Sequence, residues 1–428
     1  MLKERPEHIL LGCVADDFTG ASDAASFLAK QGIKTLLFNG TPQGNEVLQD
    51  CAAVVIALKT RSIPAAEAVR ETLKAVRWLK QHGAEQLYLK DCSTFDSTPE
   101  GNIGPDIDAV LEAYQIPYTI LCPALPINRR IVKDGVLIVD DKPVAEGHMA
   151  NHPLNPIWDS RIEELMRPQG KYPCMILDGL LLEKPRKDIL EEVEKFGKDK
   201  AHFYIVPDYT TDAQGKKIAE VFGDNRLLTG GSGILEHLAE RYKERYDCAA
   251  GQALPTGTPG KGIALSGSCS TATCVQCKAY AAGRRACAID PKHILDGSLT
   301  AEDLWEFISE SNEDSLVYSA GATDLQSRIY ADEETAARAA GALEQTLAAL
   351  ARRAFEAGYT RIIAAGGETS GAVALALGFD GFIIGESIAP GVPVMIPLNH
   401  QNIRIALKSG NFGQPDFFER ALAMMKAD

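Results

Sequence analysis

The sequence predicts an α/β protein of two domains, each a mostly parallel sheet flanked by helices, with an active-site cleft between them. Short apolar runs alternate with helix-length amphipathic stretches along most of the chain, and this alternation is typical of repeated strand–helix–strand units. A Gly- and Pro-rich stretch at residues 249–262 interrupts it and has the composition of a linker. The length of 428 residues also favours more than one domain.

The first domain, residues 1–248, opens with the clearest alternation. We expect strands at 9–14, 35–38, 54–58, 87–89 and 118–122, and helices at 21–31, 65–82 and 107–114. Turn residues at 134–135 and 140–141 indicate an antiparallel excursion. Short strands at 175–177, 203–206 and 227–228 then continue the sheet.

The second domain, residues 263–428, repeats the pattern. We expect strands at 263–265, 286–289, 316–318, 361–364 and 405–407, and helices at 272–282, 301–309, 333–357 and 372–377. Thr300 directly precedes one of these helices and is a typical N-cap residue.

The composition excludes some classes of partner. The formal net charge is −14, whereas binding to a nucleic-acid backbone requires a basic face. No apolar run approaches the ~18 residues of a membrane span, and residues 1–8 lack the layout of a signal peptide. The 10 Cys residues are scattered, as reduced thiols are in a cytosol. We therefore expect a cytoplasmic protein that binds neither nucleic acid nor membrane.

Polar side chains follow three predicted strands of the first domain, where the strands end. They are Asp16, Asp17 and Thr19 after the first strand, Arg61 after the strand at 54–58, and Lys90, Ser93 and Asp96 after the strand at 87–89. Ligands of open α/β sheets bind at the carboxyl ends of strands. Cations suit a substrate carboxylate, and a carboxylate can orient or deprotonate a hydroxyl.

Other interpretations of this group stay open. Asp16 or Thr19 could cap the first helix, and residues 96–98 could cap the next one. The site could also belong to a sugar-acid dehydratase or to a periplasmic-type binding protein, although the missing signal peptide disfavours the latter.

Three Gly- and Ser-rich loops follow strands of the second domain, at residues 266–271, 365–371 and 408–413. The first two lead into predicted helices, whose free N–H groups and dipole favour anions. Three such loops in one domain indicate a bound nucleotide. The sequence has neither the P-loop pattern G-x-x-x-x-G-K-[ST] nor a strand followed by G-x-G-x-x-G, so the site is not of either common type.

Two further patterns carry little weight. Cys269, Cys274, Cys277 and Cys287 have the spacing of an iron–sulfur site. The match falls on a Ser/Thr loop and a predicted helix that would have to unwind to surround a cluster, so we interpret these residues as packing thiols. His148 and His152 are four residues apart, yet Gly147 and Pro153 make a helix there doubtful. We expect a pocket or hydrogen-bonding role for His152, or simple surface exposure, rather than a metal site.

Seven sequence blocks resemble those of the four-carbon acid sugar kinases, most closely the 3-oxo-tetronate kinase branch. They are VADDFTGA (14–21), KDCSTFDSTPEGNIG (90–104), NHPL (151–154), LSGSCSTAT (265–273), GGETSGAV (366–373), APGVP (389–393) and LKSGNFG (407–413). The resemblance implies an N-terminal sugar-acid domain and a C-terminal nucleotide domain. It implies transfer of phosphate from ATP, with Mg²⁺, to the terminal 4-hydroxyl of a 3-oxo-tetronate.

Strand ends and resemblance together assign roles to residues. The catalytic residues are Asp16 and Asp17, one orienting the hydroxyl and the other placed to help hold Mg²⁺. The substrate-binding residues are Thr19, Arg61, Lys90, Ser93, Asp96 and His152. The ATP-binding residues are Ser266, Ser268, Gly366, Gly367, Glu368, Thr369, Ser370 and Gly410. The alternatives are a threonate or erythronate kinase and a non-catalytic sugar-acid sensor. The sequence leaves open the oligomeric state, a homo-oligomer included.

Overall fold

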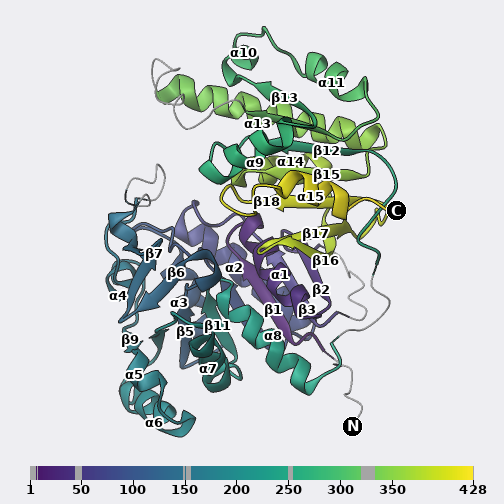
Figure 1. Cartoon of the computed structure of the whole chain (residues 1–428). Coiled ribbons are helices and arrows are strands. Elements are labelled where there is room, and N and C mark those ends of the chain that lie inside the picture. The colour runs from purple at the N-terminus through teal and green to yellow at the C-terminus, as the bar shows by residue number, and fades with distance from the viewer. Residues whose placement is uncertain are drawn as a thin grey trace. The chain divides into compact units, whose positions relative to one another are not determined.

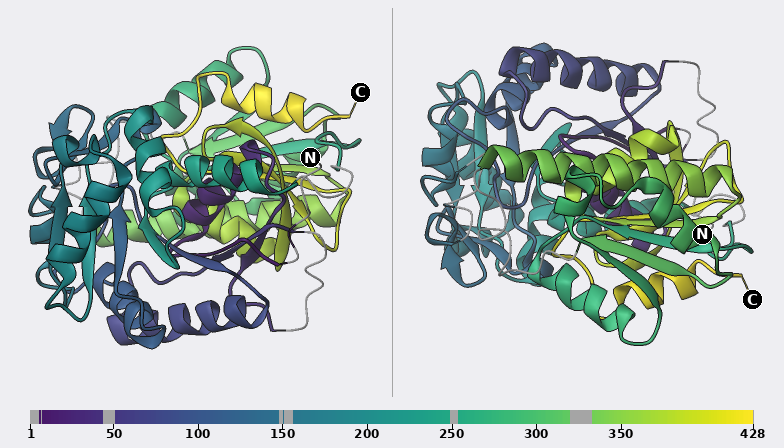
Figure 2. Two further views of the ribbon diagram at one scale, coloured as in Figure 1. Left: turned by 90° about the horizontal axis from the view of Figure 1, so that it is seen from below. Right: turned by 90° about the horizontal axis from the view of Figure 1, so that it is seen from above.

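The computed structural model describes residues 6, 8–43, 51–147, 150, 156–248, 254–319 and 333–427 (Figure 1). The chain divides into two compact units, Met1–Gly251 and Gln252–Asp428. Each contains a mostly parallel sheet with helices on both faces (Figure 2), so the predicted α/β class is confirmed. No helix in the described part of the chain is long and apolar enough to cross a membrane.

The sheet of the N-terminal unit has the order β2-β3-β1-β4-β11-β5-β10-β9, and each neighbouring pair is parallel. Its strands are β1 (Leu11–Ala15), β2 (Thr35–Asn39), β3 (Ala53–Ala57), β4 (Gln86–Lys90), β5 (Tyr118–Cys122), β9 (Cys174–Leu177), β10 (Phe203–Pro207) and β11 (Leu227–Gly230). Its helices include α1 (Phe18–Lys30), α2 (Ala65–Gln81), α3 (Ile103–Ala113), α7 (Asp212–Phe222) and α8 (Gly233–Arg245). Every residue of β1 and β3 is buried, as expected for parallel strands covered on both faces.

The chain changes direction around β1. Helix α1 leads from β1 to β2 on one side, and α2 leads from β3 to β4 on the other. Since such crossovers are right-handed, α1 and α2 cover opposite faces; α1 packs with α8, and α2 with α3. The loops after β1 and β4 therefore diverge, which makes this edge the site where ligands of such sheets bind.

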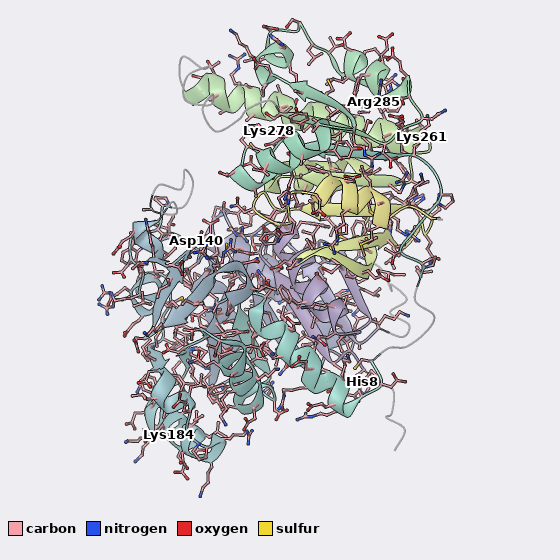
Figure 3. All side chains as sticks on the ribbon, in the orientation of Figure 1. His8, Asp140, Lys184, Lys261, Lys278 and Arg285 are labelled. Carbon is pink, nitrogen blue, oxygen red and sulfur yellow. The ribbon has the colours of Figure 1, made fainter. Side chains whose placement is uncertain are left out.

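The predicted antiparallel excursion is confirmed as a small sheet of β6 (Arg130–Lys133), β7 (Val136–Val139) and β8 (Lys142–Pro143). Asp134 and Gly135 both have positive φ, as do Asp140 and Asp141. Positive φ at both central residues is typical of the tight turns that join twisted hairpins. Exposed side chains such as Asp140 and Lys184 cover the surface of this unit (Figure 3).

The sheet of the C-terminal unit has the order β13-β14-β12-β15-β18-β17-β16. Its strands are β12 (Gly262–Ser266), β13 (Arg285–Ile289), β14 (Ser315–Ser319), β15 (Arg361–Ala365), β16 (Gly381–Ala389), β17 (Val392–Pro397) and β18 (Arg404–Lys408). Its helices include α9 (Thr271–Ala281), α10 (Pro291–Leu295), α11 (Ala301–Ser309), α13 (Glu333–Glu356), α14 (Gly367–Leu377) and α15 (Phe417–Met424). β17 runs antiparallel to both of its neighbours.

Helices α9 and α15 pack together over this sheet, whereas α14 packs with α13. The core beneath α9 and α15 contains Cys277, Ile363, Phe417 and Phe418. Cys274 and Cys277 both lie on α9. Thr300 caps α11 through a reciprocal capping box with Asp303, as predicted.

Helix starts are where the structure differs most from the sequence prediction. α14 begins at Gly367 rather than at residue 372, so the predicted loop 366–370 is the N-cap and first turn of a helix. α3 begins at Ile103 with Asn102 as its N-cap, so residues 96–98 do not cap it. The cap of α1 is Asp17, not Asp16 or Thr19. Gly, Ser and Thr have low helix propensity, and tertiary packing overrides that propensity at these positions.

Candidate active site

The parallel register of the N-terminal sheet brings the predicted charged residues to one edge. Ala15, the last residue of β1, pairs with both Ala57 and Lys90 at the ends of β3 and β4. The Asp16 N–H then donates to the Lys90 carbonyl (3.2 Å), and the Thr60 N–H donates to the Asp16 carbonyl (3.0 Å). The three loops are thus joined through their backbones.

Arg61 is bound by three carboxylates. Its Nε and Nη2 donate to the two oxygens of Asp16, each at 2.8 Å. Nη2 also lies 3.0 Å from Asp17 Oδ1, and Nη1 lies 3.9 Å from Asp96 Oδ2. Bidentate pairs of this kind fix the carboxylate as well as the guanidinium, so Arg61 orients Asp16 and Asp17.

Asp17 combines a structural and an electrostatic role. Its Oδ1 accepts from the Gly20 N–H (2.7 Å) at the start of α1, and its Oδ2 accepts from the Thr19 hydroxyl (2.8 Å). Burial opposes ionisation, but Arg61 and Lys90 outweigh it and lower the pKa of Asp17 below its usual value. Asp17 is therefore an anion at neutral pH.

Lys90 is buried at the carboxyl end of β4 and donates to the Asp91 carbonyl (2.6 Å). Its ammonium lies against the first turn of α1, because a Cβ added at Gly20 would be 3.4 Å from Nζ. Burial raises the pKa of the neighbouring Asp91 well above its usual value, and Asp16 raises it further. Lys90 thus adds positive charge beside Asp17, while the raised pKa of Asp91 disfavours a further negative charge next to it.

Ser93 is buried and accepts a hydrogen bond from Arg130 Nη1, which reaches it from the start of β6. Asn102 donates to the carbonyls of Thr60, Arg61 and Ile63 and so holds the loop that carries Arg61. The sequence interpretation missed Arg130 and Asn102, since no local pattern distinguishes them from surface residues. His148 and His152 lie outside the described residues.

The three Gly- and Ser-rich loops of the C-terminal unit are also brought together, as predicted from their strand ends. The Gly267 N–H donates to the Ala365 carbonyl (3.2 Å), and the Gly366 N–H donates to the Lys408 carbonyl (2.8 Å). The Ser270 and Thr273 hydroxyls both donate to the Gly410 carbonyl at 2.6 Å. β12, β15 and β18 are neighbours in the sheet, so the loops meet at their carboxyl ends.

Close backbone packing explains the glycines. A Cβ on Gly410 would be 2.8 Å from Ser268 Oγ, and one on Gly267 would collide with Thr369 Oγ1. Gly366 has a φ of 118°, which side-chain-bearing residues rarely adopt. Ser270 caps α9, and Gly366 is the N-cap residue of α14. Two helix N-termini thus open beside these loops, which is the arrangement that binds phosphate.

Lys408, the last residue of β18, is completely buried behind this cradle. Its Nζ donates to Thr273 Oγ1 (2.8 Å) and to the carbonyls of Gly410 (2.9 Å) and Ser409 (3.2 Å). Burial lowers its pKa from 10.5 to about 7. Ser266 is also buried, and it accepts a weak contact from Cys277 Sγ at 3.8 Å. The sequence block at 407–413 contains Lys408, but nothing in the sequence indicates a role for this residue.

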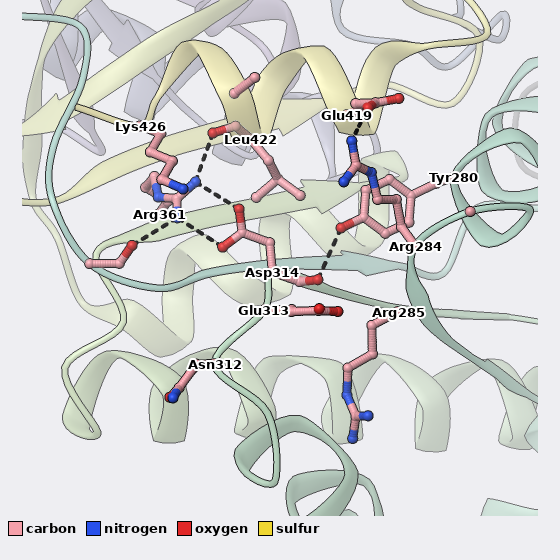
Figure 4. Close-up of a pocket in the computed structure, with 13 residues that line it drawn as sticks. Tyr280, Arg284, Arg285, Asn312, Glu313, Asp314, Arg361, Glu419, Leu422 and Lys426 are labelled. Carbon is pink, nitrogen blue, oxygen red and sulfur yellow. Dashed lines mark hydrogen bonds and ion pairs between the residues drawn. The ribbon is translucent and has the colours of Figure 1, made fainter. Parts of the chain in front are cut away.

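A hollow of about 490 Å³ lies at the opposite, amino-terminal edge of the same sheet (Figure 4). There Arg361 binds both oxygens of Asp314 at 2.8 Å and also donates to the carbonyls of Gly260 and Leu422. Arg284 is paired with Glu419. Because these cations are already bound by protein groups, the hollow is held together by structural ion pairs.

Comparison with known proteins places both units in known families of domains. Residues 11–238 match the family model described as a sugar-binding N-terminal domain, and residues 263–418 match the model described as a nucleotide-binding C-terminal domain. A Brucella melitensis protein named 3-oxo-tetronate kinase is 38% identical over 415 residues, covering 96% of this chain and 94% of that protein. A Salmonella typhimurium protein of the same name is 40% identical over 420 residues, covering 96% and 98%.

This chain belongs to the four-carbon acid sugar kinase family. The resemblance of the seven sequence blocks is thereby confirmed. Among solved structures, a protein of Salmonella typhimurium LT2 is 38% identical with a TM-score of 0.86, covering 96% of this chain and 98% of that one. Haemophilus influenzae protein HI1011 is 38% identical with a TM-score of 0.79, covering 96% and 99%.

For this four-carbon acid sugar kinase, the matched regions agree with the chemistry of the two sites. The charged cluster around Arg61 lies within the residues matched as sugar-binding, and the loops around Gly366 lie within those matched as nucleotide-binding. The nucleotide-binding character expected of the second half of the chain is thus confirmed.

Proposed function

We propose that this protein is an ATP-dependent kinase that phosphorylates the terminal 4-hydroxyl of a 3-oxo-tetronate. The observation that carries the proposal is similarity over nearly the whole chain to proteins named 3-oxo-tetronate kinase. A side-chain cluster suited to a polar acid and a backbone cradle suited to phosphates support it. The net charge of −14 disfavours a nucleic-acid substrate.

The C-terminal loops would bind ATP. Backbone N–H groups at the start of α14, from Gly367 to Thr369, and those of Ser268 and Cys269 are suited to the phosphates. The N–H groups of Gly267 and Ser370 already donate to the Ala365 and Gly366 carbonyls. Gly366 and Gly410 allow the loops to approach closely, and the Ser268 hydroxyl is an additional donor at the same edge. Ser266 is buried at the end of β12, so we assign it to positioning of the loop.

The N-terminal cluster would bind the acid and position its hydroxyl. Both oxygens of Asp16 are held in a bidentate ion pair with Arg61, whereas Asp17 Oδ2 accepts from the neutral Thr19 hydroxyl. We therefore assign Asp17 to the reacting hydroxyl or to Mg²⁺, and Asp16 to their support. A carboxylate of lowered pKa suits this role, because phosphoryl transfer relies on positioning and charge more than on a strong base.

Mg²⁺ prefers carboxylate oxygens and the oxygens of phosphates, and the ionised Asp17 fits as a ligand. When bound with the nucleotide, the ion would neutralise charge that develops on the transferred group. The remaining predicted residues, Ser93, Asp96 and Thr19, would line the acid. His152 stays a prediction from the sequence.

The test is identification of the product. The protein is incubated with MgATP and a 3-oxo-tetronate, and the acid product is examined by mass spectrometry and phosphorus NMR. A new phosphomonoester on the terminal carbon, formed together with ADP, is the expected result. Phosphorylation of only threonate or erythronate would move the proposal to that alternative. Thermal stabilisation by acid but not by ATP, with no product, would favour the sensor.

A further inference from the structure

The carboxylate of a sugar acid needs a cation that is not already paired with a protein carboxylate. Which cation this is matters only if the protein acts on a sugar acid, so the inference rests on the proposed function. Three cations belong to the N-terminal cluster: Arg61, Lys90 and Arg130. They differ in what surrounds them, and that difference indicates which one meets the substrate.

Arg61 is unsuited to the carboxylate of the substrate. Both sides of its guanidinium face protein anions, with Asp16 bound by two donors, Asp17 at 3.0 Å and Asp96 at 3.9 Å. A second carboxylate at the same fork would have to displace one of these and would meet their repulsion. Its position supports the aspartates instead.

Arg130 is in the opposite situation. The Arg130 guanidinium donates to a neutral group, the Ser93 hydroxyl. Within the part of the chain that the structure describes, no carboxylate oxygen lies within 4 Å of this guanidinium. The side chain is half-buried. A guanidinium with donors to spare at the rim of a polar site is suited to bind a carboxylate in a bidentate manner.

The charge of Arg130 reaches the centre of the cluster. Asp23 accepts a hydrogen bond from the Ser232 hydroxyl. Its carboxyl group also interacts electrostatically with Lys90, Arg130 and Asp17. Burial raises the pKa of Asp23 above its usual value, and the two cations only partly offset that. The raised pKa makes Asp23 less readily ionised than an exposed Asp beside these two cations.

The backbone of Arg130 is well fixed. Arg130 opens β6, pairs with Val139 across the hairpin, and accepts from the Leu125 N–H at 2.7 Å. The preceding Arg129 takes the left-handed conformation, with a φ of 56°, so the chain turns sharply just before the strand. A side chain on a paired strand is held more rigidly than one on a free loop.

We propose that Arg130 binds the carboxylate of the sugar acid and selects acids over neutral sugars, with the buried Lys90 adding positive charge behind it. The antiparallel sheet β6–β8 then serves substrate recognition and is not merely an insertion in the fold. Arg61 remains a positioning residue for Asp16 and Asp17.

The test compares a 3-oxo-tetronate with the four-carbon ketose in which CH₂OH replaces its carboxylate. Arg130→Met is expected to lower the acid-to-ketose ratio of kcat/KM roughly 10- to 100-fold, the range for a hydrogen bond to a charged group. Arg130→Lys keeps the charge and should retain part of the preference. Arg129→Met is the matched control, since Arg129 is exposed and paired with Asp140 and Asp141, and it should keep the wild-type ratio.

Binding of the 3-oxo-tetronate without nucleotide, measured by calorimetry on the three variants and the wild type, separates this proposal from the kinase proposal. Binding that weakens in Arg130→Met, and less in Arg130→Lys, but not in Arg129→Met supports the role of Arg130 even if no variant turns over. Unchanged binding and an unchanged ratio in a folded Arg130→Met overturn it. A wild type that turns over the acid and the ketose equally well overturns it too, while leaving the kinase function intact. A wild type that neither binds nor phosphorylates the acid overturns both.

Discussion

β1 of the N-terminal unit and β12 of the C-terminal unit hold the same position in their sheets. Each is the first strand of its unit, and the orders β2-β3-β1-β4 and β13-β14-β12-β15 repeat one winding. The loops that leave this point differ completely. After β1 and β4 come Asp16, Asp17 and Lys90, whereas after β12 and β15 come loop 266–270 and Gly366.

The topology therefore determines the edge where a ligand binds, while the residues at that edge determine which ligand binds. A small acid with distinct hydroxyl and carboxylate groups needs directed side chains, and Arg61 keeps two aspartates in fixed positions. A chain of phosphates offers many equivalent oxygens, so backbone N–H groups at two helix ends suffice. Glycines shape the site of the second unit, and ion pairs shape the site of the first.

Removal of one charge from the first unit should have the largest effect. Asp17→Asn retains an N-cap for α1, since Asn caps helices as well as Asp does, but it loses the anion. We expect kcat to fall about 10³-fold, within the range for such groups, with the Kd for ATP unchanged by calorimetry. Full turnover in this variant would show that Asp17 is only a helix cap.

Loss of the buried Arg361–Asp314 ion pair, at the amino-terminal edge of the C-terminal sheet, should lower stability without affecting the charged cluster around Arg61. Arg361→Met leaves Asp314 and two carbonyls without their donor, and we expect a loss of about 3–5 kcal/mol in the C-terminal unit. Hydrogen exchange resolved by unit would measure it. Arg284→Met, which removes an exposed arginine of the same hollow, is the control and should change little. Equal losses in both units would mean that they unfold together.

A glycine substitution tests the backbone cradle. Gly366→Ala adds a Cβ 3.2 Å from the Ser268 N–H at a φ of 118°, a conformation that costs about 1–3 kcal/mol. We expect affinity for ATP to fall roughly tenfold or more, with acid binding unchanged. Gly371→Ala lies on the same helix, where an added Cβ meets nothing within 4 Å, and it should bind ATP normally. Loss of acid binding in Gly366→Ala would contradict the division of roles.

Lys408 gives the second site a pH dependence that is the smallest of these effects. The pKa is lowered by burial from 10.5 to about 7, and the neighbouring side chains are Thr273, Cys277 and the Phe417 ring. Nucleotide phosphates favour the protonated form, so binding should take up a proton, and affinity should decline several-fold as pH rises from about 6 to 9. Calorimetry in two buffers of different ionisation enthalpy would detect the proton, and Lys408→Met should abolish it.

The same lysine affects stability with the opposite sign. Between about pH 7 and 10.5 the unfolded chain holds a proton that the folded chain has released, so without nucleotide its contribution favours folding more as pH rises. A denaturation series over that range, with Lys408→Met as the reference, should show a rising difference. A flat difference would mean that the folded pKa of Lys408 is not lowered.

The buried strands were predictable because parallel strands covered on both faces are continuous apolar runs, and Tyr118–Cys122 was placed to the residue. The meeting of Asp16, Arg61 and Lys90 followed from strand ends alone. β16, β17 and α15 were not predicted, and the early start of α14 was missed because Thr369 packs under Gly267, a contact that no local pattern reveals. Arg130 and Lys408 were missed for the same reason, since their partners lie far along the chain.

The most direct test of the account is a coupled ADP-release assay with MgATP against a panel of 3-oxo-tetronates, threonates and erythronates of both hands. The account predicts turnover that is fastest on a 3-oxo-tetronate and that requires both the Asp17 anion and the Gly366 loop. ADP release that is independent of any four-carbon acid, or that persists undiminished in Asp17→Asn, would contradict it.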